Sequence, residues 1–174
     1  MSSYPNIKKA LDSIHRSADL KLEEDGYLLA CECCGENYVE KNIRNFKRIS
    51  NSFPQRPDCG EIDILVVNLK LRIIFVVDAK NQKREIYPSG ISREEKVFWS
   101  KGGHAEKLRK KEQFVSMNLS IFLKYFNIND TTGWKTKRAF LTKKHYINAF
   151  IAESDIDFVL LSDFVLYLTE GRVK

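Results

Sequence analysis

Four charged side chains flank two of the most apolar segments of the chain. Glu61 and Asp63 stand at the start of one segment, and Asp78 and Lys80 follow the next. Carboxylates this close repel one another beside an apolar core, and a divalent cation such as Mg²⁺ or Mn²⁺ removes that cost. A neighbouring lysine can orient or deprotonate a water and offset charge on a phosphate. The chemistry indicated is metal-dependent hydrolysis of a phosphodiester, and loss of Asp78 should relieve repulsion in the metal-free protein.

A β-hairpin must hold these side chains. The segments Ile62–Val67 and Leu71–Val77 are rich in β-branched residues and are separated by Asn68-Leu69-Lys70, which predicts two mostly buried antiparallel strands. Strand residues alternate between faces, so charged residues two positions apart point the same way.

The register follows from the turn. If Asn68 pairs with Leu71, Glu61 lies opposite Asp78, and all four charged side chains share one face. A slip of one residue would split the set. An ion-pair network at the end of a hairpin is the competing interpretation, and the acid-x-Lys spacing after a buried strand favours chemistry over it.

The remaining elements follow from apolar periodicity and turn residues. The pattern predicts a mixed sheet flanked by helices, an α/β fold. We expect helices at 6–18, 36–46 and 104–126, a polar connection at 19–26, strands at 27–31, 47–53, 137–142 and 158–161, a loop at 54–60, irregular chain at 81–103, and a last helix through 168 that Ser162 and Asp163 cap.

Composition narrows the class of protein. The 174 residues are 43% hydrophobic and 30% charged, as in an ordinary globular chain. The formal net charge of +6 and the pI near 9.1 favour an anionic partner, nucleic acid above all. No apolar run reaches the roughly 18 residues of a membrane span, and the N-terminus is too polar for a signal peptide. A cytoplasmic protein is expected.

The hairpin resembles the PD-(D/E)xK nuclease superfamily, the restriction-endonuclease-like fold. The resemblance lies in Gly60–Leu65 (GEIDIL) and Phe75–Gln82 (FVVDAKNQ), and it is nearest the nuclease-related-domain and Holliday-junction-resolvase-like branches. It covers about residues 36–82 and implies an αβββαβ core. We therefore expect one nuclease-like domain over 1–174 with a helical extension at about 1–26, and whether a longer protein contains this chain stays open.

The resemblance also implies residue roles. The metal-binding acids of the two motifs correspond to Asp63 and Asp78, the further carbonyl ligand to Ala79, and the catalytic lysine to Lys80. The second acid is aspartate where many members have glutamate, which the motif permits. A literal Pro57-Asp58 also precedes the hairpin, but Asp63 is preferred because it sits within a strand.

Two further site residues come from the family pattern. Many members add a glutamate from the first core helix, a role that we carry to Glu40, with Glu36 one helical turn away as the alternative. Val39 stands where an aromatic residue is common. Gln82 continues the alternation past the lysine and assists at the site in some branches, although a polar strand end explains it equally well.

A nucleic-acid surface is expected beside this site. His104, Lys107 and Lys111 share one face of the helix predicted after the hairpin, which in related nucleases lines the substrate groove. A solvated charged face is the alternative. Trp99 and Lys101 combine an aromatic ring with a positive charge, a pairing that can stack on bases, although such a ring can also anchor a loop.

The cysteines form a second cluster. Four thiolates would suit a structural Zn²⁺, but the spacing is unusual, and free thiols are the favoured interpretation. The residues are Cys31, Cys33, Cys34 and Cys59.

The predicted function is that of a Mg²⁺- or Mn²⁺-dependent nuclease acting on DNA, in DNA processing or in defence against foreign DNA as the resemblance implies. The alternative is an inactive nuclease-fold module that binds nucleic acid or mediates assembly. Endonuclease relatives often dimerise, so a homodimer stays open, although no interface signature is evident. DNA is favoured over RNA by the resemblance alone.

Overall fold

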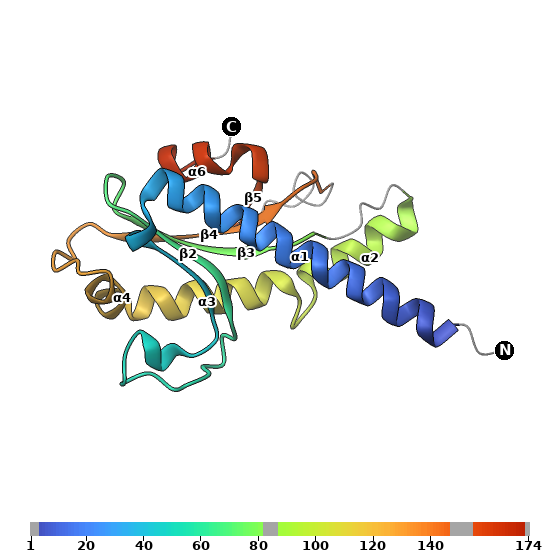
Figure 1. Ribbon diagram of the computed structural model, residues 1–174, viewed down its shortest axis with the longest axis horizontal. Coiled ribbons are helices and arrows are strands. Elements are labelled where there is room, and N and C mark those ends of the chain that lie inside the picture. Colours follow the sequence, from blue (N-terminus) through green and yellow to red (C-terminus); the bar gives the residue numbers. More distant parts are fainter. Residues whose placement is uncertain (1–3, 82–86, 147–154, 173–174) are drawn as a thin grey trace.

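The fold is built on one mixed sheet of five strands in the order β1-β2-β3-β4-β5 (Figure 1). The computed structural model describes residues 4–81, 87–146 and 155–172. β1–β2 and β2–β3 are antiparallel pairs, whereas β3–β4 and β4–β5 are parallel pairs. The strands are β1 Val39–Ile43, β2 Ile62–Asn68, β3 Ile73–Ala79, β4 Lys135–Thr142 and β5 Asp157–Leu160.

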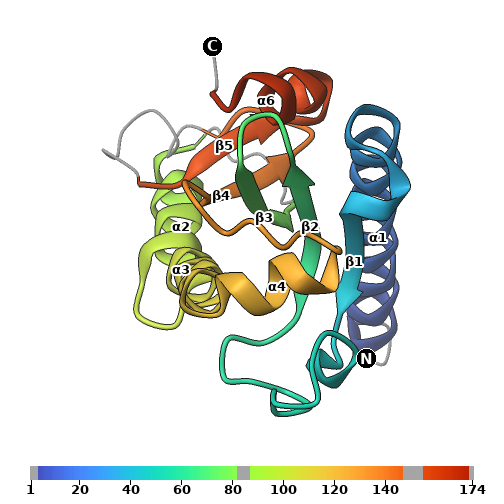
Figure 2. The same ribbon diagram turned by 90° about the vertical axis from the view of Figure 1, so that its left-hand side faces the viewer.

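Helices cover both faces of the sheet (Figure 2). Within the described ranges, none of them is both long and apolar enough to cross a lipid bilayer. They are α1 Tyr4–Cys34, α2 Pro88–Trp99, α3 His104–Met117, α4 Leu119–Tyr125 and α6 Phe164–Glu170, with 3₁₀ turns at Glu36–Tyr38, Phe46–Arg48 and Leu161–Asp163.

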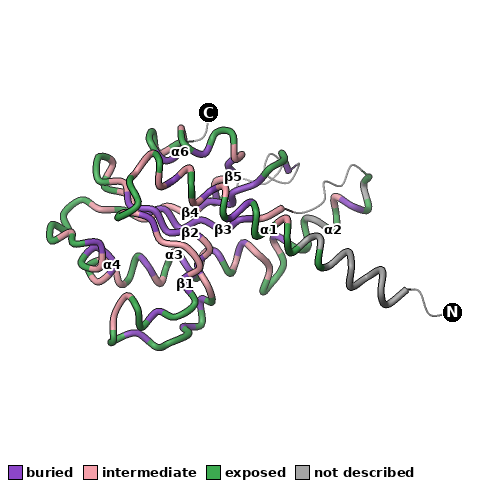
Figure 3. Tube along the Cα trace, viewed as in Figure 1, coloured by how far each residue is buried: buried purple, intermediate pink, exposed green. Residues whose placement is uncertain are grey.

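The strands separate two apolar clusters because their side chains alternate between faces. Ile64 and Val77 belong to the cluster beneath α1 and α6, while Leu65 and Val76 belong to the cluster beneath α3 and α4. Figure 3 shows the sheet as the most continuously buried part of the fold. The expected α/β class, with a mixed sheet flanked by helices, is confirmed.

The hairpin is confirmed, with its register shifted by two residues. Asn68 pairs with Ile73 rather than Leu71, and Ile64 pairs with Val77. The turn is longer than predicted, with Arg72 at φ +55°. A shift of two residues preserves the faces. Continuing the observed register by one residue places Asp63 directly opposite Asp78.

The N-terminal elements differ most from the sequence-based prediction. α1 runs unbroken through the predicted polar connection 19–26 and the predicted strand 27–31. Its buried positions Leu22, Gly26 and Ala30 recur every fourth residue, which is helical spacing. At Gly26 a Cβ would come within 2.3 Å of Leu141 Cδ2, so the helix lies very close to the sheet.

The predicted helix 36–46 is wrong. A 3₁₀ turn leads there into β1, which pairs with β2, and the predicted strand 47–53 is a second 3₁₀ turn followed by other turns. Pairing with a buried strand outweighed the helical spacing of Val39, Ile43 and Phe46, since local propensity is a weak preference.

The C-terminal half follows the predicted order with altered boundaries. The stretch 81–103 contains α2, and the predicted helix 104–126 breaks at Asn118 into α3 and α4. Both predicted C-terminal strands are present, at 135–142 and 157–160. Asp163 stands at the N-cap of α6, but its side chain makes no capping hydrogen bond.

Candidate active site

Asp63 and Asp78 meet at the end of the β2–β3 ladder. Asp78 is 2% exposed and continues the buried run of β3. Asp63 Oδ2 accepts a hydrogen bond of 3.0 Å from the backbone N–H of Ala79. The second strand therefore fixes the carboxylate of the first, and both acids come to one place on the face beneath α3.

Lys80 joins this acid pair, as the strand parity predicted. Its Nζ lies 3.4 Å from Asp78 Oδ2 and 3.7 Å from Asp63 Oδ2. The same ammonium donates to the Ala79 carbonyl at 3.1 Å. The expected convergence of Asp63, Asp78 and Lys80 is thus confirmed. Glu61 is not part of it, because its carboxylate pairs with Arg44 at 2.6 Å.

Lys111 is a second positive charge in the cluster. Its Nζ lies 2.5 Å from Asp78 Oδ1 and 3.9 Å from Asp63 Oδ1, and the residue is only 7% exposed. The sequence predicted a helix face that lines a substrate groove, with a solvated face as the alternative, whereas the structure buries Lys111 against Asp78. Lys111 lies three residues after Leu108 and four before Val115, within the buried stripe of α3, and that spacing was the available signal.

The pKa values of the two aspartates are shifted in opposite directions. Burial, followed by the charge of Asp78, raises the pKa of Asp63 to about 6. Burial also opposes ionisation of Asp78, but Lys80 and Lys111 outweigh it, and the pKa of Asp78 falls below its ordinary value. Asp78 is therefore the anchored anion of the cluster, and Asp63 is the carboxylate whose charge is poorly compensated.

Glu23 of α1 is the acid that sequence reasoning missed. It is 9% exposed, and its Oε1 has no hydrogen-bond partner among the described residues. Burial, then the charges of Asp63 and Glu61, raises its pKa to about 7. It lies beside Leu22 on the buried side of α1, but the predicted helix ended at residue 18 and excluded it.

Glu40, the predicted helix glutamate, lies on strand β1 instead. Tyr125 Oη donates to its Oε1 at 2.5 Å, and Arg48 lies 3.9 Å from its Oε2. The alternative, Glu36, stands in the 3₁₀ turn before β1. Glu40 therefore contacts Tyr125 and Arg48 rather than the Asp63–Asp78 pair. The reason is that residues 39–43 form strand β1 beside β2 and not a helix.

The donor atoms of the cluster fit a hard divalent cation. Carboxylate oxygens of Asp63 and Asp78 and the carbonyl of Ala79 are the oxygen ligands that Mg²⁺ prefers. Glu23, whose Oε1 has no hydrogen-bond partner in the described part of the chain, lies on α1 at the other face of the sheet, where the charge of Asp63 still affects its pKa. Among the described residues, no group of three or more His, Cys, Asp or Glu side chains is arranged around one point. Lys80 and Lys111 supply the positive charge there, and a cation would compete with Lys111 for Asp78 Oδ1.

The other predicted nucleic-acid residues have mixed positions. His104 packs edge-on against Phe98 at 5.3 Å, and burial, followed by the charge of Lys80, lowers its pKa to about 4. Lys101 and Lys107 are exposed. Trp99 packs against the core and near Phe158, as expected of a ring that anchors a loop. Gln82 lies outside the described residues.

The four cysteines are free thiols. Three of them pack against the cluster beneath α1, whereas Cys59 belongs to the cluster on the other face of the sheet. Four sulfurs on opposite faces of a sheet do not share one tetrahedral centre. The arrangement therefore gives no support to a zinc site built from all four.

Replacing Glu23 with glutamine should stabilise the metal-free protein at high pH. Because its folded pKa is raised from 4.5 to about 7, the folded state holds this proton more tightly than the unfolded chain does. The free energy of unfolding therefore falls as pH rises through that window, and glutamine should recover up to roughly 3 kcal/mol above it. The gain should vanish below about pH 4.5.

Denaturant melts over this pH range, in the presence of a chelator, measure the effect. Glu24→Gln is the matched control because Glu24 is an exposed neighbour on the same helix, where it pairs with Lys41. A Glu23→Gln variant that is less stable than wild type above about pH 7 would contradict the assignment of a strained, buried acid.

No protein-family model matches this chain, and no curated protein or solved structure matches it either. The functional argument therefore rests on the site itself.

Proposed function

We propose that this chain is a metal-dependent nuclease that hydrolyses phosphodiester bonds in DNA, built on the PD-(D/E)xK plan. One observation carries the proposal. The carboxylates of Asp63 and Asp78, from the facing ends of two adjacent strands, both lie within 3.7 Å of the Lys80 ammonium. An acid on one strand and an acid-x-Lys on the next is the arrangement that the resemblance implies.

The order of elements supports the same proposal. α1, the strands β1 to β3, α3 and β4 follow one another as the αβββαβ core requires, with α2 inserted before α3. The acid pair lies where β2 begins and β3 ends, and α1 brings Glu23 to the same end of the sheet. We therefore transfer the role of the helix glutamate from Glu40 to Glu23.

The proposed chemistry divides roles among a few groups. Asp63, Asp78 and the Ala79 carbonyl would hold Mg²⁺ or Mn²⁺, which when bound polarises a phosphate oxygen and lowers the pKa of a water. Lys80, held by both aspartates, is placed to orient the attacking water and to offset charge that develops on the phosphate. Glu23, whose charge interacts with that of Asp63, would take the supporting role of the helix glutamate, and its pKa of about 7 would suit proton transfer.

A second candidate function is favoured by the position of Lys111. Its ammonium lies against Asp78 Oδ1 in a buried ion pair, an arrangement that needs no metal. A nuclease fold with a permanently self-neutralised cluster would bind nucleic acid or mediate assembly without cutting. The two candidates differ in one property, which is turnover.

A cleavage panel tests the proposal. Wild-type protein is incubated with plasmid, linear duplex, single-stranded DNA and RNA, each with Mg²⁺, with Mn²⁺ and with EDTA. The nuclease proposal expects metal-dependent products from at least one DNA substrate. Binding to DNA with no cleavage of any substrate would support the second candidate, and cleavage in EDTA would contradict the metal role.

A further inference from the structure

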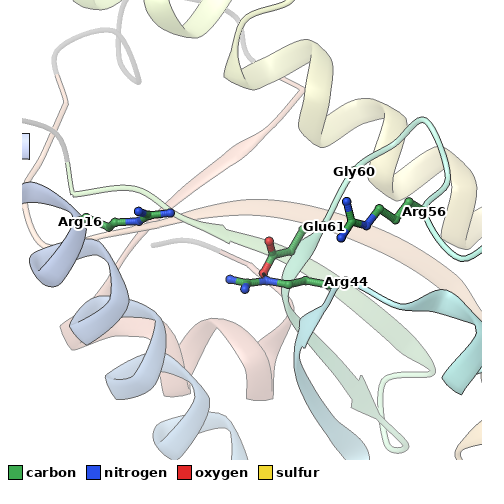
Figure 4. A pocket seen from close by; sticks show the side chains of 5 residues that line it. All are labelled: Arg16, Arg44, Arg56, Gly60 and Glu61. Atoms are coloured by element: carbon green, nitrogen blue, oxygen red, sulfur yellow. Dashed lines mark hydrogen bonds and ion pairs between the residues drawn. The ribbon is translucent and has the colours of Figure 1, made fainter. Parts of the chain in front are cut away.

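Three arginines surround a pocket at the edge of the proposed active site. The pocket has a volume of about 380 Å³ and is lined by Arg16, Arg44, Arg56, Gly60 and Glu61 (Figure 4). Arg16 comes from α1, Arg44 follows β1, and Arg56 lies in the loop before β2. In Figure 4, Arg16 extends from its helix toward the pair formed by Arg44 and Glu61. Residues far apart in the sequence thus build one basic hollow.

The side chains that line the pocket carry a net positive charge. Glu61 provides the one carboxylate that lines the pocket, and its Oε1 lies 2.6 Å from Arg44 Nε in an ion pair. Over the described part of the chain, Arg16 and Arg56 form no ion pair and no side-chain hydrogen bond. Three guanidinium groups against one carboxylate leave a formal charge of +2. Guanidinium groups bind phosphate through two parallel N–H donors, so this surplus favours a phosphate ligand.

The pocket adjoins the acid cluster. Glu61 is two residues before Asp63, and the pKa of Glu23 responds both to Glu61 and Arg44 and to Asp63 and Lys80. Glu23 therefore lies within electrostatic reach of both sites. Gly60 has φ +78°, and an added Cβ there would meet no atom within 4 Å, so the wall at this point is open.

We propose that Arg16, Arg44 and Arg56 bind a phosphate group of the nucleic-acid strand whose scissile phosphodiester lies at Asp63, Asp78 and Lys80. This inference rests on the proposed function and adds to it a subsite beside the cut. The pocket volume exceeds that of a phosphate and admits part of the attached sugar. The phosphate is either the terminal monoester of a strand end or an internal diester, and both present the same oxygens to the guanidinium groups.

Binding without turnover tests the subsite. The affinity for a short DNA duplex, labelled at its 3′ end and carrying either a 5′-phosphate or a 5′-hydroxyl, is measured in EDTA. The variant is the double substitution Arg16→Gln with Arg56→Gln. The matched control, Lys70→Gln with Arg172→Gln, removes two exposed charges from the opposite end of the hairpin, roughly 20 Å away.

We expect each lost arginine to weaken binding by about tenfold, and the double variant to have a shallower salt dependence than the control. Loss confined to the 5′-phosphate duplex assigns the pocket to a terminal phosphate, and equal loss on both duplexes assigns it to an internal one. A double variant that binds both duplexes as the control does overturns the subsite. Glu61→Gln, which removes the only carboxylate that lines the pocket, should strengthen binding.

The two claims fail separately. If the wild-type protein cleaves no substrate but its DNA affinity depends on Arg16 and Arg56, the phosphate site stands and the nuclease proposal fails. If the wild-type protein cleaves DNA and the double variant matches the control in affinity, the nuclease proposal stands and the subsite fails.

Discussion

Replacing Lys80 with alanine is expected to lower the rate of DNA cleavage by at least about a hundredfold while changing DNA affinity little. The ammonium of Lys80 contacts both aspartates and the Ala79 carbonyl, so in the proposed mechanism it would act at the reacting phosphate rather than along the bound strand. An interaction made mainly in the transition state appears in the rate more than in binding. Single-turnover cleavage at saturating protein, with affinity measured in EDTA, separates the two quantities.

Lys107→Ala is the contrasting variant. Lys107 lies on the exposed side of α3, whose buried side carries Lys111. If α3 borders the substrate, its loss should weaken affinity and reduce the salt dependence, while the rate at saturation is retained. Lys80→Ala protein that cleaves at the wild-type rate would remove the lysine from the proposed chemistry.

Replacing Asp78 with alanine is expected to destabilise the metal-free protein by about 3–5 kcal/mol, because it leaves the buried ammonium of Lys111 without its 2.5 Å partner. The sequence alone led to the opposite prediction, in which removal of one carboxylate relieves repulsion. In the structure Lys80 and Lys111 both contact Asp78, so its loss leaves a buried ammonium unpaired, and these contacts favour the opposite sign. Denaturant unfolding in EDTA measures the change.

Asp63→Asn is the matched control for this stability effect. The asparagine carbonyl can still accept the hydrogen bond from the Ala79 N–H, and Asp63 is the acid whose ionised form burial disfavours. Its stability should equal or exceed that of wild type near neutral pH. Equal stability of Asp78→Ala and wild type would show that the Lys111–Asp78 pair contributes nothing to the fold. A loss of stability in Asp78→Ala is compatible with both a structural and a catalytic role of the cluster. The catalytic role is therefore tested by comparing the cleavage activity of Asp63→Asn with that of wild type.

The hairpin and its charged face were predictable from sequence because their signals are local. Dense β-branched runs identify the strands, and strand parity puts Asp63, Asp78 and Lys80 together even when the turn is misjudged, since the register error was two residues. A register error of one residue would have separated them.

The other members of the cluster depend on long-range packing. Glu23 and Lys111 are charged residues within buried helical stripes, and no local rule distinguishes such a residue from a solvated neighbour. Gly26 favours a break in α1 by propensity, yet the helix continues, and the Leu141 side chain occupies the space that a Cβ would fill there. Glu40 has helical spacing, but pairing with Leu65 of β2 makes its segment a strand. In each case tertiary contacts outweighed local preference.

The most direct test of the central claim is a time course of DNA cleavage by wild type and Asp63→Asn at equal concentration, with Mn²⁺ and with EDTA. Asp63→Asn is chosen because it should fold as stably as wild type, so that lost activity reports chemistry and not unfolding. The account predicts cleavage by wild type with Mn²⁺, none in EDTA, and a loss of at least about a hundredfold in the variant. Cleavage at equal rates by both proteins, or no cleavage by wild type with either Mn²⁺ or Mg²⁺, would contradict it.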